Sequence, residues 1–278
     1  MRRTIVAIVV IAIVLIGIIG YAISGFAAAQ TRIGNADRTL NDVISHQNSL
    51  NTTFKDLNTK FSALSSSTFD PQQDRSLFDQ FVTVEKAAGV TINKDDTSLV
   101  SAKASLAEQQ WLTVLSRGTL NSEAARIDHA RTALSTAKTI AAGYVQVGQF
   151  FQAYFDAEID LQTFTAQNVN ADFPAAKTTL TTMKTHVDTA LQLSTAPGLP
   201  TALHDLMTDF EAVITDYGKL LDAAIAGDDR AILSAEKSIE ADTNKMGTYN
   251  FDKIVADIGA YYKPLFDSVD SEMAKATA

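Results

Sequence analysis

The sequence predicts an all-α protein: an N-terminal transmembrane helix followed by an elongated bundle of about seven helices with coiled-coil-like packing. Three observations predict this fold. A 19-residue apolar stretch without a charge lies near the N-terminus. Helix breakers are scarce, with 13 Gly and 5 Pro in 278 residues. Apolar residues in the remainder recur at spacings of three and four, as they do on one face of a helix.

The apolar stretch Ile5–Ile23 is long enough to cross a bilayer. At ~1.5 Å per residue it spans about 28 Å, close to the ~30 Å hydrocarbon core. A cleaved signal peptide is the rival interpretation, because Ala27-Ala28-Ala29 satisfies an A-x-A cleavage site. The stretch exceeds the ~7–15 apolar residues usual in such peptides, so we expect residues 1–29 to be a retained membrane anchor.

Basic residues near the apolar stretch favour one orientation in the membrane. Arg2 and Arg3 precede it and favour a cytoplasmic N-terminus, whereas Arg32 and Arg38 beyond it weaken that preference. We therefore expect a single-pass protein of the cell membrane. Residues 30–278 would form its extracytoplasmic helical domain.

The domain is acidic and contains no cysteine. Setting Arg2 and Arg3 aside, 21 of the 23 Lys and Arg remain against 32 Asp and Glu, a net charge of about −11. Such a surface repels phosphate backbones and anionic headgroups, which argues against nucleic-acid binding. The absence of cysteine excludes disulfides, thiol nucleophiles, Cys-ligated zinc and iron–sulfur clusters.

A regular 3.5-residue repeat, here called the heptad stripe, opens the domain. Its positions are Ile33, Ala36, Leu40, Val43, Gln47, Leu50, Phe54, Leu57, Phe61 and Leu64. This repeat predicts a helix packed along a narrow strip, with Gln47 helping to set the register. The partner is either another helix of this chain or the same segment of a second subunit. We prefer the first, because two other predicted helices are long enough to lie alongside.

Capping and breaking residues divide the rest of the chain into six further helices. The expected ranges are 70–89, 96–118, 121–164, 173–191, 203–224 and 232–273, the last with a possible break at 247–250. Asp70, Pro71 and Gln73 suit the N-cap, N1 and N3 positions of a helix start. Gly89 is expected to end that helix, before a loop at residues 91–94.

Three polar or Gly/Pro-rich segments mark further turns. Pro197-Gly198-Leu199-Pro200 is the strongest loop signal, and Gly227-Asp228 fits a C-cap followed by an N-cap. Residues 168–172 form a polar break. Two halves could meet there, although the long helices favour one bundle.

The histidines and acidic residues give no recognisable catalytic or metal-ligand set. His46, His129, His186 and His204 lack the spacing that places two ligands on one helix face, so we expect surface histidines. Asp156, Glu158 and Asp160 follow an aromatic run at helical spacing. We expect a solvated acidic face and buried aromatic rings. The aromatic residues are Tyr144, Phe150, Phe151, Tyr154 and Phe155.

Two aromatic features near helix irregularities leave alternatives open. Tyr261 and Tyr262 precede Pro264, which distorts a helix. One interpretation is a hinge or a surface for a partner. The other, which we prefer, is that one ring is buried and the other is exposed. Trp111 is either an exposed contact for a partner or the edge of a core.

The leading functional hypothesis is a non-enzymatic envelope protein. We identify no catalytic, cofactor-binding or metal-binding residues and expect no cofactor. The expected partners are the lipid bilayer, through the N-terminal helix, and another protein or a second copy of this chain. The alternative is an extracytoplasmic ligand-binding or sensory module that acts through a separate membrane partner.

The anchor generates the first testable prediction. The full-length protein should remain with membranes through a carbonate wash, because Ile5–Ile23 can span the hydrocarbon core. A shortened chain that begins at Gln30 should be recovered in the soluble fraction. Isolation from cells of a mature protein that begins at Gln30 would contradict the retained anchor.

Overall fold

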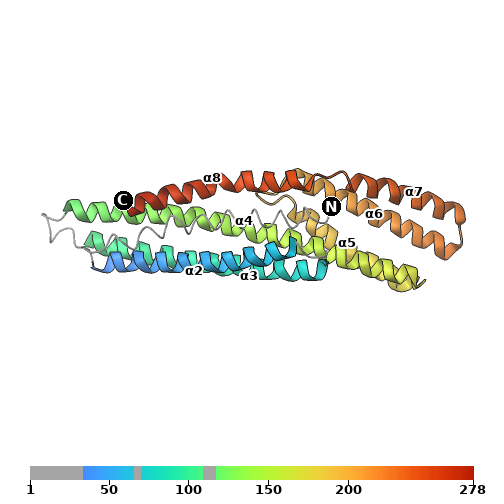
Figure 1. Cartoon of the computed structure of the whole chain (residues 1–278), viewed down its shortest axis with the longest axis horizontal. Helices are drawn as coiled ribbons and strands as arrows, with labels where there is room; N and C mark the ends of the chain where they lie inside the picture. Colours follow the sequence, from blue (N-terminus) through green and yellow to red (C-terminus); the bar gives the residue numbers. More distant parts are fainter. Residues whose placement is uncertain (1–33, 66–69, 109–116) are drawn as a thin grey trace. The chain divides into compact units, whose positions relative to one another are not determined.

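The computed structural model describes residues 34–65, 70–108 and 117–278, and this part of the chain is 92% helical with no strand. It confirms the all-α expectation (Figure 1). The helices are α2 Gly34–Ser65, α3 Pro71–Glu108, α4 Arg117–Val169, α5 Phe173–Leu193, α6 Thr201–Ala226, α7 Asp229–Met246 and α8 Phe251–Thr277.

None of the helices in the described ranges combines the length and the apolar character needed to cross a membrane. The predicted span Ile5–Ile23 lies outside these ranges, and so does Trp111. The membrane anchor and the role of Trp111 therefore stay predictions.

The described residues belong to two compact units, each of which has its own core. Of the described residues, unit 1 contains 63–65, 70–82 and 145–258, and unit 2 contains 34–62, 83–108, 117–144 and 259–278. Helices α3, α4 and α8 are each divided between the two units, and α2 belongs to unit 2 except for its last three residues. The possible junction near residues 168–172 lies inside unit 1, at the turn between α4 and α5.

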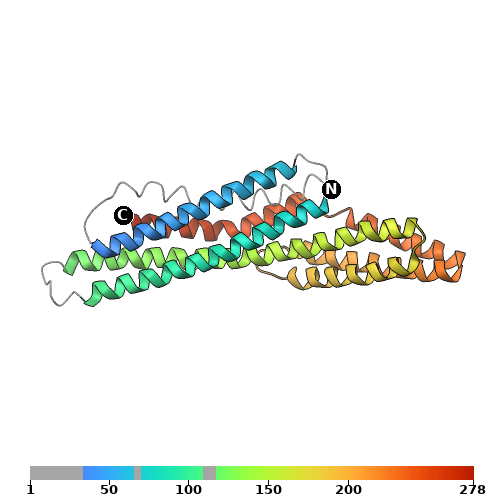
Figure 2. The same ribbon diagram turned by 90° about the horizontal axis from the view of Figure 1, so that it is seen from below.

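In unit 2, four helical segments lie side by side (Figure 2). Polar contacts join α2 to α3, α3 to α4 and α4 to α8. Apolar side chains on the facing sides are buried, among them Val43, Leu99, Ile127, Leu134, Phe266 and Val269. Burying each large apolar side chain contributes about 1.5–3 kcal/mol, which holds the four segments together.

The heptad stripe of α2 faces the interior of unit 2 wherever its side chains are described. Ala36, Leu40 and Val43 are at most 5% exposed, and Gln47 is 8% exposed. Leu50 is half-buried. Ile33 and the stripe positions from Phe54 onward lie outside the described side chains. Because α2 packs against α3 of the same chain, the intramolecular alternative is confirmed for the described positions.

Helix α3 is continuous through the segment expected to be a loop. The predicted helix end at Gly89, the loop at 91–94 and the new start at Asp96 are wrong. Buried residues continue at spacings of three and four through this segment, namely Phe78, Phe81, Glu85, Ala88, Ile92, Asp95 and Leu99. Burying this apolar face stabilises the helix by more than the low helix propensities of Gly and the β-branched residues destabilise it, because helix propensity is a weak preference.

Two other boundaries differ from expectation. Helix α4 begins at Arg117, so Gly118 opens a helix instead of closing one, and α4 ends at Val169 instead of near Phe164. The expected last helix is divided into α7 and α8 by residues 247–250, the possible break. The number of helices in the described ranges equals the expected seven, because two expected helices form the single helix α3 and the expected last helix is divided into two.

Caps define the helices of unit 1 where the sequence predicted turns. The side chain of Asp172 accepts a hydrogen bond from the Ala175 N–H at the start of α5. Asp228 caps α7 in the same way through two N–H groups. Gly227 ends α6 with a φ of 67°, a conformation that other residues adopt at a cost. Helix α6 packs against both α5 and α7.

Replacing Gly89 by Ala should stabilise the protein by about 0.5–1 kcal/mol. The position is helical, and an added Cβ would meet no atom within 4 Å. Gly227→Ala is the matched control, and it should destabilise by about 1 kcal/mol because of its positive φ. Urea unfolding of both variants measures the two effects. A loss of stability in Gly89→Ala would contradict the continuous helix.

Candidate functional site

Each of the four histidines bonds one partner from another part of the chain. The pairs, measured from Nδ1 to the partner oxygen, are His46–Asp95 at 2.7 Å, His129–Glu272 at 2.7 Å, His186–Asp160 at 2.9 Å and His204–Ser194 at 3.0 Å. All four rings keep part of their surface exposed, as predicted. Within the described ranges, no group of three or more His, Asp and Glu is placed to hold a metal ion.

The carboxylates Asp156, Glu158 and Asp160 are less solvated than expected. Asp156 accepts a hydrogen bond from Arg75 Nε of α3 at 2.8 Å, and its side chain is 28% exposed. Asp160, with its histidine partner, is 17% exposed. Burial raises the pKa of Glu158, and a hydrogen bond from Tyr154 opposes that rise. The prediction of a solvated acidic face is wrong, because each carboxylate has its own neighbour.

The aromatic run of α4 belongs to the core, as predicted. Its five rings are at most 8% exposed. In unit 1, Phe78 of α3 stacks on Phe151 with ring centroids 5.0 Å apart, and it contacts Phe155 at 5.6 Å. A Cβ added at Gly148 would lie 2.5 Å from Val82, so α3 and α4 approach closely here. These residues stabilise the fold.

Gln47 has the register-setting position that the heptad stripe predicts. Its Nε2 donates to Asp95 Oδ2 at 3.2 Å, and His46 bonds the other carboxylate oxygen. Asp95 is 2% exposed. The two donors compensate the buried carboxylate, since an unpaired one would be costly. We therefore interpret this cluster as a structural contact between α2 and α3, not as a catalytic site.

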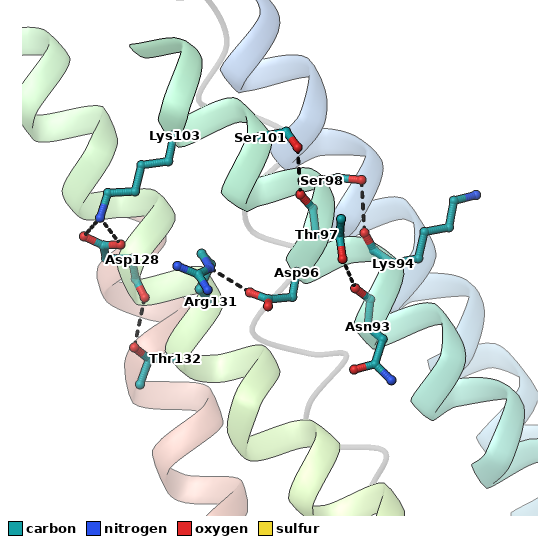
Figure 3. A network of polar contacts seen from close by, with 10 residues as sticks. All are labelled: Asn93, Lys94, Asp96, Thr97, Ser98, Ser101, Lys103, Asp128, Arg131 and Thr132. Carbon is teal, nitrogen blue, oxygen red and sulfur yellow. Dashed lines mark hydrogen bonds and ion pairs between the residues drawn. The ribbon is translucent and has the colours of Figure 1, made fainter. Parts of the chain in front are cut away.

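A surface network joins α3 to α4 farther along unit 2 (Figure 3). Lys103 donates to both oxygens of Asp128 at 2.5 Å, and Arg131 Nε donates to Asp96 at 2.7 Å. In the same segment of α3, Thr97 and Ser98 donate to backbone carbonyls four residues earlier. Both hydroxyls thus bond within the helix where a loop was expected, so they need no partner from another segment.

The α6–α7 hairpin of unit 1, residues 201–246, is fixed by polar contacts at one end and exposes two large apolar side chains near the other. Asp209, 6% exposed, accepts from Lys245 Nζ and from the Tyr249 hydroxyl, both at 2.6 Å. Near the turn at residues 227–228, Ile225 is 59% exposed and Leu233 is 67% exposed. We call Ile225 and Leu233 the hairpin tip.

Helix α7 leaves more of its apolar side exposed than the other helices of unit 1. Ala235 is its buried residue, whereas Ile232, Ile239 and Met246 are half-buried. Val169, at the end of α4, is 80% exposed. The end of α4 and the α6–α7 turn lie at the same end of unit 1 (Figures 1 and 2). Apolar surface therefore gathers at that end.

A buried carboxyl group in unit 2 escaped the sequence analysis. Glu85 of α3 is 2% exposed, and burial raises its pKa well above the ordinary value. Close to it lie Tyr144 of α4 and Tyr262 of α8, whose rings stack with centroids 4.4 Å apart. Tyr262 is 1% and Tyr261 48% exposed, so the preferred interpretation of this pair is confirmed. The position of Glu85 in the apolar face of α3 was the available signal.

No protein-family model, curated protein or solved structure matches the chain. The function must therefore be inferred from these contacts and surfaces.

Asp74 gives a prediction for the pH dependence of stability. Burial and the nearby charge of Asp70 raise the pKa of Asp74 from 3.8 to about 6. The folded state therefore holds this proton more tightly than the unfolded chain. The stabilising contribution is complete below pH 3.8 and is lost as the pH rises through about 6.

Asp74→Asn cannot ionise and should lack this loss. Between pH 4 and pH 7, its free energy of unfolding relative to the natural protein should increase by roughly 2 kcal/mol. Urea unfolding at both pH values measures this difference. Asp222→Asn, which removes a 64%-exposed carboxylate of a surface ion pair, is the control and should show little change. Parallel pH profiles for Asp74→Asn and the natural protein would contradict the raised pKa.

Proposed function

We propose that this chain is a non-enzymatic, membrane-anchored protein whose extracytoplasmic helices recognise another protein through the hairpin tip. The exposure of Ile225 and Leu233 carries the proposal. Leaving such side chains in water forgoes part of the roughly 1.5–3 kcal/mol that full burial of each would contribute. Exposed apolar patches rimmed by polar residues mark protein-interaction sites, and we propose that the hairpin tip is the centre of such a patch.

The charge around the hairpin tip indicates the chemistry of the partner. Residues 220–242 contain six Asp or Glu against two Lys or Arg. Asp228, Asp229, Glu236 and Glu240 are all exposed. A two-fold contact between identical hairpins would bring these carboxylates together, which disfavours self-association here. The fitting partner is a protein with an apolar groove or helix face bordered by Lys or Arg.

The location of this function follows from the N-terminal sequence. An uncharged stretch of 19 residues preceded by Arg2 and Arg3 supports a single membrane span with the N-terminus in the cytoplasm. The helical units would then act outside the cytosol, at a distance from the bilayer set by the chain between Ile23 and α2.

Position 233 can be tested with a photo-crosslinking amino acid in the full-length protein in its native cells. We expect one discrete adduct, whose second component is a basic-rimmed protein identified by mass spectrometry. The adduct should disappear when Ile225→Asn is added and weaken when Glu236 and Glu240 are changed to Lys. Position 90 is the matched control, since Val90 is 69% exposed and lies on α3.

The outcomes separate the candidate partners. Equal adducts at positions 90 and 233, or none at either, would refute recognition through the hairpin tip. An adduct with the mass of two copies of this chain would indicate self-association instead. Leu233→Asn and Val90→Asn should both melt like the natural protein, because neither side chain is buried.

A further inference from the structure

The carboxyl group of Glu85 lies in the interior of unit 2. Among the described residues, no Lys, Arg or His forms an ion pair with it, and its Oε1 atom is buried without a hydrogen-bond partner. The neighbouring Lys86 is exposed and does not face Glu85. An isolated carboxylate in such a place costs several kcal/mol, so the neutral acid is the form that the packed core accepts.

The described groups that face Glu85 from the other helices carry no positive charge. Helix α4 contributes Tyr144 and α8 contributes Tyr262, with Tyr261 beside it. Burial is the largest cause that raises the pKa of Tyr144 and of Tyr262, and the charge of Glu85 would raise both further. Helix α2 runs antiparallel to α3 (Figure 2), and Asp56 in its second half is exposed. None of these groups compensates a negative charge on Glu85.

The segment of α8 that covers Glu85 is tightly fitted and locally weakened. The hydroxyl of Tyr262 lies so close to Gly143 of α4 that a Cβ there would overlap it. Two residues further, Pro264 lies inside α8, where it cannot donate to the carbonyl of Ala260. If Glu85 ionised, the tightly packed Tyr262 and Gly143 could not move to let water reach the charge. The nearby turn at Pro264, which lacks one hydrogen bond, is the part of α8 that would open most easily.

We propose that Glu85 is a proton-binding switch of unit 2: the packed state of α3, α4 and α8 requires the neutral acid, and loss of the proton loosens this packing. The proton passes to water, so no other reactant is needed. The sign follows from the raised pKa of Glu85, since the stabilisation is complete below the ordinary pKa and decreases as the pH rises. This switch is independent of the hairpin tip, and it gives the sensory-module alternative a physical basis.

Hydrogen exchange of α8 peptides in the full-length protein tests the switch between pH 6 and pH 9. After correction for intrinsic exchange, protection of residues 259–277 in the natural protein should fall by up to tenfold per pH unit. Glu85→Gln keeps the shape and stays neutral, so its protection should be independent of pH. Asp267→Asn removes an exposed carboxylate of the same helix and should retain the natural pH dependence.

Two further measurements keep the test decisive. Glu85→Leu provides the same comparison if the glutamine variant does not fold, and it should also be insensitive to pH. Protection that is constant from pH 6 to pH 9 in the natural protein would overturn the proposal. A pH dependence that persists unchanged in either Glu85 variant would do the same.

Discussion

The hydrogen bonds that His46 and Gln47 make with Asp95 determine how α2 lies against α3 in unit 2. A heptad stripe alone permits several registers, because a shift of one helical turn brings another row of apolar residues into contact. Such a shift would separate Asp95 from both donors and leave a buried carboxylate unpaired. On another side of α3, the Lys103–Asp128 and Arg131–Asp96 pairs join the same stretch of this helix to α4.

Features written in local sequence were predictable. The caps at Asp70 and Asp228, the polar break at 168–172 and the turns at 197–200 and 227–228 depend on a few neighbouring residues, and all were found where expected. The burial of the first four described stripe positions followed from spacing alone. Gly89 was interpreted as a helix end from its residue type alone. The helix continues because residues in the following turn are still buried. Ala88 and Ile92 show that burial continues there.

The partners of polar residues could not be predicted, since they depend on packing between distant segments. Arg75 and Asp156 are 81 residues apart, and the expectation of a solvated acidic face failed for that reason. Glu85 was missed because a single acidic residue in an apolar register is indistinguishable, by spacing, from one at the edge of that face. Whether it is enclosed depends on Tyr144 and Tyr262, which come from two other helices. The hairpin tip was missed because the sequence alone does not distinguish an exposed leucine such as Leu233 from a leucine of the core.

The contact between α4 and α8 also constrains the order in which the protein is made. His129 and Glu272 are 143 residues apart, and Arg126 donates to the carbonyl of Ala276 across 150 residues. The segments of unit 2 that precede α8 therefore leave the ribosome long before the segment that completes them. The contacts of α5, α6 and α7 in unit 1 join helices that follow one another directly in the sequence. Until α8 is made, the apolar side chains of α2, α3 and α4 that it buries stay exposed to water. A chain that terminates before α8 would therefore leave part of the core of unit 2 exposed.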